Sequence, residues 1–147
     1  MDFSLRLDSL VRSRNYEFFP RMMYSPISGT HIPLQEGYYL GVYVDLVAVH
    51  LPYEDEYKSR FEELNFQTST LVSYQAIRHN TYWFVGIQIN NQGEIYQLKL
   101  QISRTNGMVD LILFSPRICM NYRGVMWAKW DRLQSDYKWL KAKSSKP

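Results

Sequence analysis

The chain has 147 residues, of which 46% are hydrophobic and 16% aromatic. That length suits one domain with a substantial core, and that composition excludes intrinsic disorder for all but the ends. A single cysteine, Cys119, excludes an internal disulfide framework, and the sequence shows neither a signal-peptide pattern nor a run of about 20 apolar residues. We therefore expect one cytoplasmic globular domain over residues 1–141, with no membrane contact, and a flexible basic tail over residues 142–147.

The formal net charge of +3 is unevenly distributed along the chain. Residues 1–115 hold 9 Lys/Arg and 12 Asp/Glu, whereas residues 116–147 hold 8 Lys/Arg and 2 Asp/Glu. The basic character therefore belongs to the C-terminal segment. Such a segment is typical of a contact with an acidic protein or with nucleic acid, or else of a solvated helix face with a tail that confers solubility.

A short helix and a long irregular segment are predicted at the N-terminal end. Residues 3–12 place Phe3, Leu7, Leu10 and Val11 on one helical face, although the first residues also fit a strand. Residues 15–36 are punctuated by three prolines and a glycine and are predicted to form an irregular loop. Because this loop is rich in apolar residues, we expect it either to cover the body of the domain or to contact a partner.

Residues 37–51 are dominated by Tyr and Val and are predicted to form one long strand or a bent pair of strands. Pro52 then suits the first turn of a helix, and the acidic residues at 54–56 suit a helix N-terminus. The helix is predicted to continue to about Leu64. Its apolar face consists of Tyr53, Tyr57, Phe61 and Leu64.

A meander over residues 70–114 is the clearest pattern in the sequence. Its strand-length runs alternate apolar and polar residues with a period of two, as in a sheet with one buried face. Asn-Gln-Gly and Thr-Asn-Gly separate the last three runs and suit hairpin loops, because Gly and Asn tolerate positive φ. The buried face of the middle run is predicted to consist of Tyr96, Leu98, Leu100 and Ile102.

Residues 125–141 are predicted to form a long C-terminal helix. An apolar seam recurs at spacings of three and four, at Met126, Trp130, Leu133, Tyr137 and Leu140. The predicted fold class is therefore α+β: an antiparallel sheet of about five strands, with this helix packed on one face and one or two further helices. The arrangement is similar in architecture to helix-grip ligand-binding domains, but no motif ties the chain to a family.

No catalytic or metal-binding pattern is found. The three histidines, His31, His50 and His79, have no partner at the spacing of metal ligands, and one cysteine cannot form a CxxC motif. Gly-rich phosphate loops are absent, since the seven glycines are scattered singly. We therefore expect no enzyme activity, no catalytic residue, no metal and no cofactor.

The predicted partner-binding residues come from two segments. Trp139, Arg132 and Lys143 share an outward stripe of the C-terminal helix, where a large apolar ring is typical of an interface, although the ring could instead pack on the 15–36 loop. Tyr24 and Met23 lie in that loop. The favoured hypothesis is a non-enzymatic protein-binding module, such as an immunity or inhibitor protein that occludes the surface of a protein partner, with an acidic partner among those expected.

Two alternatives remain open from the sequence. The second hypothesis is a binder of an apolar small molecule, held between the sheet and the C-terminal helix, with Tyr38, Tyr43 and His50 as polar contacts. The third is a single-stranded nucleic-acid binder that stacks bases on Tyr82 and Phe84, with Arg78 and Lys99 nearby. The negative balance of residues 1–115 counts against the third hypothesis, because it would repel phosphates.

Overall fold

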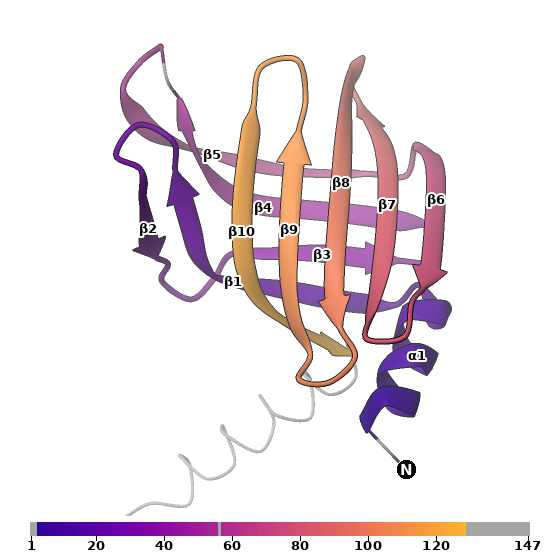
Figure 1. The fold of residues 1–147 in the computed structure, drawn as a ribbon. Coiled ribbons are helices and arrows are strands. Elements are labelled where there is room, and N and C mark those ends of the chain that lie inside the picture. The colour runs from indigo at the N-terminus through magenta and orange to yellow at the C-terminus, as the bar shows by residue number, and fades with distance from the viewer. Residues whose placement is uncertain (1–2, 56, 129–147) are drawn as a thin grey trace, which may run out of the picture.

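A computed structural model describes residues 3–55 and 57–128, which form a single curled antiparallel sheet with one helix (Figure 1). The helix is α1 (Phe3–Ser13), and the strands follow in chain order. They are β1 (Tyr16–Ser25), β2 (Thr30–Pro33), β3 (Tyr39–Tyr43), β4 (Leu46–Asp55), β5 (Arg60–Thr68), β6 (Leu71–Arg78), β7 (Tyr82–Asn91), β8 (Glu94–Ser103), β9 (Met108–Phe114) and β10 (Cys119–Ala128).

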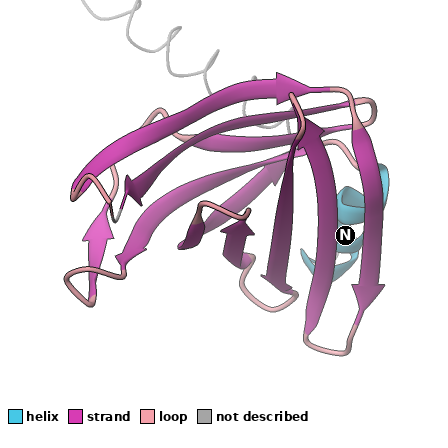
Figure 2. Ribbon diagram, turned by 90° about the horizontal axis from the view of Figure 1, so that it is seen from above, coloured by secondary structure: helices cyan, strands magenta, loops and turns pink. Residues whose placement is uncertain are grey.

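The strand order is β5-β4-β3-β1-β10-β9-β8-β7-β6, with β2 paired to β1. Strand β1 joins the two halves of the sheet, because it pairs with β3 on one side and with β10 on the other. The strands of one half cross behind those of the other half, so that the sheet curls into a half-barrel (Figures 1 and 2). Helix α1 lies at one end of the curl, below strand β6 in Figure 1.

The inner face of the half-barrel is filled by side chains. Alternate residues of the central strands point inward, because a strand directs successive side chains to opposite faces. The largest fully buried side chains are Tyr16, Phe18, Met23, Leu40, Leu51, Ile89, Leu98, Leu100, Ile102, Leu111, Leu113 and Met120. Helix α1 adds Leu7 and Val11 to this core. The inner face is therefore a packed core.

The two ends of the sheet approach each other at a corner beside the β5–β6 connection. The Thr68 hydroxyl donates to the carbonyl of Asn90 over 2.7 Å, and the Asn90 amide donates to the carbonyl of Thr70 over 3.0 Å. The Phe66 and Tyr96 rings lie 5.1 Å apart on the inner side of this corner. Strands β5 and β6 do not pair with each other, so each forms an edge of the described sheet.

The predicted α+β fold class is wrong, whereas the antiparallel meander within it is confirmed. Strands β6 to β9 cover residues 71–114, and the four inward residues expected of the middle run are all buried. The predicted N-terminal helix is also confirmed, as α1. The sheet, however, holds ten strands rather than about five, and one helix is present within the described residues.

The helix predicted from Pro52 to Leu64 is wrong, because these residues belong to the β4–β5 hairpin. Asp55, which was expected near the start of the helix, stabilises the turn between β4 and β5 instead. Its carboxylate accepts hydrogen bonds from the amides of Tyr57 and Lys58, each over 3.0 Å. An aspartate that accepts from amides two and three residues ahead occurs at helix N-termini and at tight turns alike. Tyr57, expected on an apolar face, is 98% exposed in the turn.

The predicted loop over residues 15–36 is also wrong, because it contains strands β1 and β2. Its prolines are compatible with a sheet. Pro20 lies in β1 between the residues that pair with β3, which end at Phe18, and those that pair with β2, which begin at Met22. Pro20 therefore interrupts no pairing with β3 or β2, and the register with β10 shifts beside it.

The predicted C-terminal helix is wrong at its start, because residues 125–128 belong to strand β10. The remainder of it, and the predicted tail over residues 142–147, lie outside the described residues. In the part of the chain that the structure covers, no helix has the length and apolar character needed to cross a bilayer. The expected cytoplasmic location stays a prediction.

Candidate protein-contact surface

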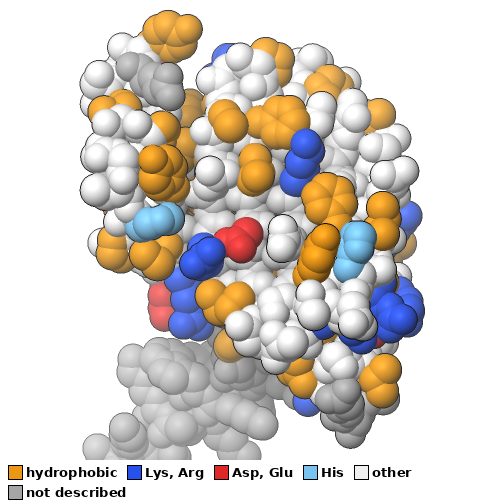
Figure 3. All heavy atoms as spheres, in the orientation of Figure 1, with side chains coloured by type: hydrophobic (Ala, Val, Ile, Leu, Met, Phe, Trp, Pro, Cys, Tyr) orange, Lys and Arg blue, Asp and Glu red, His pale blue; other side chains and the backbone are white. Residues whose placement is uncertain are grey.

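The outer face of strands β6–β9 carries apolar side chains exposed to solvent. Ile77 is 50% exposed and Ile112 is 40% exposed, while Phe84 and Phe114 are half-buried. The Lys99 ammonium nitrogen lies 5.1 Å from the centre of the Phe114 ring, and strand pairing places Lys99 beside Ile112. We call these five residues the outer patch. Figure 3 shows this face, with hydrophobic side chains interspersed with a basic one.

Polar residues border the outer patch on one side. A hollow of about 500 Å³ lies over the ends of β7, β8 and β9, and its lining includes Tyr82, Gln101 and Asp110. Asp110 also accepts a hydrogen bond from Arg123 Nε over 2.9 Å, and both side chains of this ion pair are more than half exposed. An apolar centre with a polar border is the usual composition of a protein–protein contact surface.

The two edges of the sheet differ in charge. Strand β5 carries Arg60, Glu62 and Glu63, and Arg60 Nε bonds Glu62 over 2.8 Å. Charged side chains of this kind keep an edge strand from pairing with another chain. Strand β6 carries no charged residue before Arg78, its last residue, and every side chain in it except Tyr74 is exposed. The β6 edge therefore lacks the protection that the β5 edge has.

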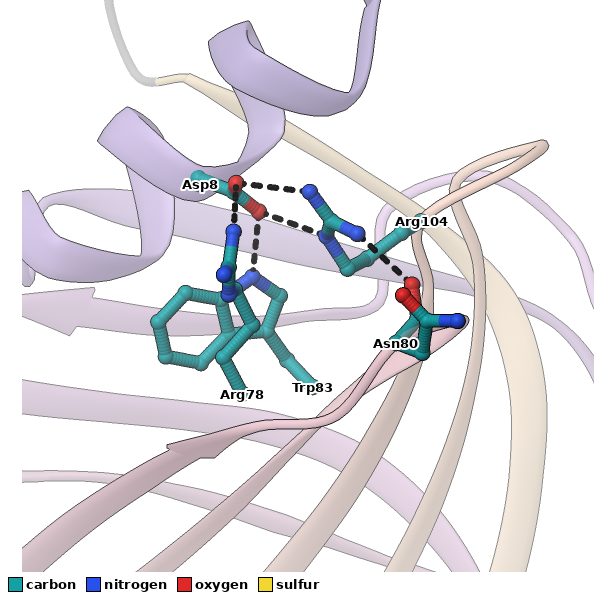
Figure 4. Close-up of polar contacts among 5 residues, drawn as sticks. All are labelled: Asp8, Arg78, Asn80, Trp83 and Arg104. Atoms are coloured by element: carbon teal, nitrogen blue, oxygen red, sulfur yellow. Dashed lines mark hydrogen bonds and ion pairs between the residues drawn. The ribbon is translucent and has the colours of Figure 1, made fainter.

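A buried carboxylate fixes helix α1 to the end of the half-barrel near β6 (Figure 4). Asp8 is 1% exposed and accepts hydrogen bonds from Trp83 Nε1 over 2.7 Å and from Arg104 Nε and Nη2 over 2.9 Å each. Arg104 Nη1 also donates to the carbonyl of Asn80, and Arg78 Nη1 lies 3.4 Å from the carboxylate. The hydrogen bonds from Arg104, above all, hold the pKa of Asp8 well below its usual range in spite of burial.

Basic side chains gather around this end of β6. The guanidinium of Arg14 lies 4.2 Å from the centre of the Tyr74 ring, and that of Arg12 lies 5.5 Å from the Trp83 ring. Both arginines are exposed, and neither forms an ion pair with the described part of the chain. We call Arg12, Arg14 and Arg78 the arginine cluster. Among the described residues, the one carboxylate that forms an ion pair with this cluster is Asp8, which Arg104 also binds.

The partner-binding residues predicted from the sequence do not assemble into one described surface. Met23 is 1% exposed and packs in the core, opposite Tyr122 of β10. Tyr24 is half-buried, with its ring 5.5 Å from the ring of His31. Trp139, Arg132 and Lys143, the predicted stripe, lie outside the described residues.

The polar residues expected in a small-molecule pocket lie on the outer face of the sheet. The Tyr38 hydroxyl donates to Glu63 over 3.0 Å, and His50 Nε2 lies 3.3 Å from the other oxygen of that carboxylate. The hydroxyl of Tyr43 donates to Glu17 over 2.9 Å. These contacts tie neighbouring strands together on the side opposite the core, so they do not converge on an internal cavity.

The residues predicted to hold nucleic acid are divided between the two faces. Tyr82 and Phe84 point outward, as does Lys99, which is compatible with a stacking platform. Arg78 pairs with the inward residue Trp83 and reaches Asp8. Within the described residues, no group of three or more His, Cys, Asp and Glu gathers as a metal site would require.

The outer patch, the β6 edge and the cluster around Asp8 were not identified from the sequence. One signal was present. Asp8 lies next to Leu7 and three residues before Val11, so a charged residue lies on the predicted buried face of α1. Such a residue needs partners of opposite charge. Nothing in the sequence shows that β6 ends the sheet, because edge position depends on pairing between distant segments.

The comparisons with known proteins support the fold. The structure is similar to the crystal structure of a DUF4251 family protein from Bacteroides eggerthii DSM 20697, with a TM-score of 0.67, 8% sequence identity and 86% of each chain covered. No curated protein matches the chain. The family model described as domain of unknown function DUF4251 matches residues 3–126. The chain therefore belongs to the DUF4251 family.

Proposed function

We propose that the protein is a non-enzymatic protein-binding module that contacts its partner through the outer patch. The observation that supports this proposal is the exposure of Ile77 and Ile112 on the outer face of a sheet whose inner face already holds a complete core. These side chains are not needed to complete the core. A partner that covers them removes apolar surface from water, which favours association.

The expected contribution of the outer patch to binding is moderate. Covering an exposed isoleucine is worth about 1 kcal/mol, because roughly half of each side chain is already buried. Replacing both by threonine, which keeps the β-branched shape suited to a strand, is expected to cost about 2 kcal/mol of binding free energy. That loss corresponds to a weakening of about 30-fold.

The experiment compares the wild type with the double variant Ile77→Thr/Ile112→Thr and with Gln67→Thr. Gln67 is exposed on β5, at the other edge of the sheet, so it serves as the matched control. Each tagged protein is used to capture partners from an extract of its native cells, and the captured proteins are quantified by mass spectrometry. We expect a stoichiometric partner with the wild type and the control, and its loss with the double variant at an unchanged melting temperature. Absence of a partner, or equal capture by all three proteins, would contradict the proposal.

A further inference from the structure

The free edge of strand β6 is suited to accept another strand. Its eight residues end the described sheet, and the strand beside it, β7, pairs with it from Leu71 to Arg78. An edge strand directs half of its backbone amides and carbonyls away from its neighbour, where they can bond an added chain. Side chains along this edge are small or uncharged up to Ile77. A peptide strand bound along residues 71–77 would therefore desolvate no charged side chain of β6.

The charge around β6 favours an acidic occupant. The arginine cluster lies along the C-terminal half of the strand, since Arg14 covers the ring of Tyr74, the fourth of its eight residues, and Arg78 is its last residue. Asp8 is occupied by Arg104, so the cluster keeps a net positive charge within the described residues. Carboxylates of an added chain would be attracted to this half of the edge.

A second copy of the chain fits this edge less well than an acidic peptide. Two β6 strands paired with each other would bring no carboxylate to either arginine cluster, because the strand contains neither Asp nor Glu. An eight-residue edge is also short for a stable dimer, which buries on the order of 1,200 Å² or more in total. Nucleic acid would meet the arginines but could not form the ladder of backbone hydrogen bonds that the edge offers.

We propose that β6 binds an extended acidic peptide segment of a partner protein as an added antiparallel strand, with its acidic residues beside Arg14 and Arg78. This inference rests on the proposed protein-binding function and names the class of partner segment. All pairs in the described sheet are antiparallel, so the acidic residues belong at the N-terminal end of the segment. Side chains on its outer face lie next to Ile77, so alternate positions are apolar.

The test measures binding of synthetic peptides to the full chain by fluorescence anisotropy. The probe is a labelled octapeptide, Asp-Glu-Val-Ser-Val-Ser-Val-Ser, and the comparison peptides begin with two lysines or carry the acids at the C-terminal end. Two further peptides are N-methylated on either set of alternate amides, so that one of them loses its donors toward β6. We expect the probe to bind at least tenfold more tightly than the lysine peptide and the reversed peptide. We also expect one of the two methylated peptides to lose binding.

Charge-reversed variants locate the site on the protein. Arg14→Glu is expected to weaken probe binding at least tenfold, whereas Arg21→Glu, an exposed arginine on β1, is expected to leave binding unchanged. Equal binding of the methylated and unmethylated peptides would overturn the inference. It would also be overturned by a single-stranded oligonucleotide that binds more tightly than the probe, or by a dimer in sedimentation that occupies the edge.

The results separate the two proposals. If the partner is captured through the outer patch but Arg14→Glu changes neither its capture nor probe binding, strand addition is wrong and the protein-binding proposal stands. If the wild type captures no partner, the protein-binding proposal fails and the inference of a partner segment fails with it.

Discussion

Replacing Asp8 by alanine tests whether the buried carboxylate fixes helix α1 to the half-barrel. The substitution leaves Trp83 Nε1, in a side chain only 4% exposed, without its acceptor, at a cost of about 1–3 kcal/mol. It also removes both charge-assisted bonds from Arg104, whose side chain is 14% exposed. Removing one partner of a buried ion pair costs about 3–5 kcal/mol.

The expected loss for Asp8→Ala lies toward the lower end of that range. Arg104 keeps its hydrogen bond to the carbonyl of Asn80, and Arg78 is half exposed. Water can therefore replace part of the hydrogen bonding that each arginine loses with the Asp8 carboxylate. We therefore expect the free energy of unfolding to fall by about 3 kcal/mol. The measurement is urea unfolding at pH 7, followed by circular dichroism, with the slope against urea compared between proteins.

Asp110→Ala is the matched control for this measurement. Asp110 also accepts a hydrogen bond from an arginine over 2.9 Å, but both side chains of that pair are more than half exposed. An exposed pair contributes about 0–1 kcal/mol, so the control should change stability by no more than that. A loss for Asp8→Ala below about 1 kcal/mol, or no larger than the loss for Asp110→Ala, would refute the reasoning. Burial would then have no effect on the contribution of the ion pair to the free energy of unfolding.

Three further predictions follow from the packing and the charges. A Cβ at Gly124 would overlap the backbone of strand β1, so Gly124→Ala should cost at least about 3 kcal/mol in thermal unfolding. Its control is Gly86→Ala, where the nearest side-chain atom is 3.7 Å from the added carbon and stability should change by less than about 1 kcal/mol. Tyr122→Phe removes the hydroxyl that donates to the buried carbonyl of Pro52 over 2.6 Å, and urea unfolding should show a loss of about 1–3 kcal/mol. The folded pKa of Asp8 lies below the unfolded value of about 3.9, so its stabilisation is present above that pH and is lost as the pH falls toward the folded pKa. The stability difference between the wild type and Asp8→Asn should therefore stay constant from pH 7 to pH 5 and shrink below about pH 4.

The sequence predicted the local structure well where one face of a strand is apolar and the other polar. Residues 96–103 alternate without interruption, and the structure places them in β8 with the expected face inward. The same rule could not identify β10, because Gly124 replaces an apolar residue on its inner face and Trp127 adds one on its outer face. Its last residues, 125–128, were therefore assigned to the predicted C-terminal helix.

The candidate site could not be predicted, because it depends on which strands end the sheet. Thr70 to Ile77, the first run of the predicted meander, was expected as a strand, but an exposed edge and a covered strand can have the same composition. The contacts of Asp8 join α1 to β7 and to the turn after β8, more than 70 residues away. Periodicity describes neighbours along the chain and carries no information about such pairs.

The position of β1 between β3 and β10 has a consequence for how the protein is made. Tyr16 pairs with Ala128, so the first strand to leave the ribosome finds its neighbour on the side opposite β2 and β3 only after the last described strand has been synthesised. Until then, one side of β1 has no partner, and its phenylalanines and methionines are available to other chains. Contacts between such distant segments form slowly. Nascent chains stalled before β10 should therefore require chaperones far more than the finished protein does.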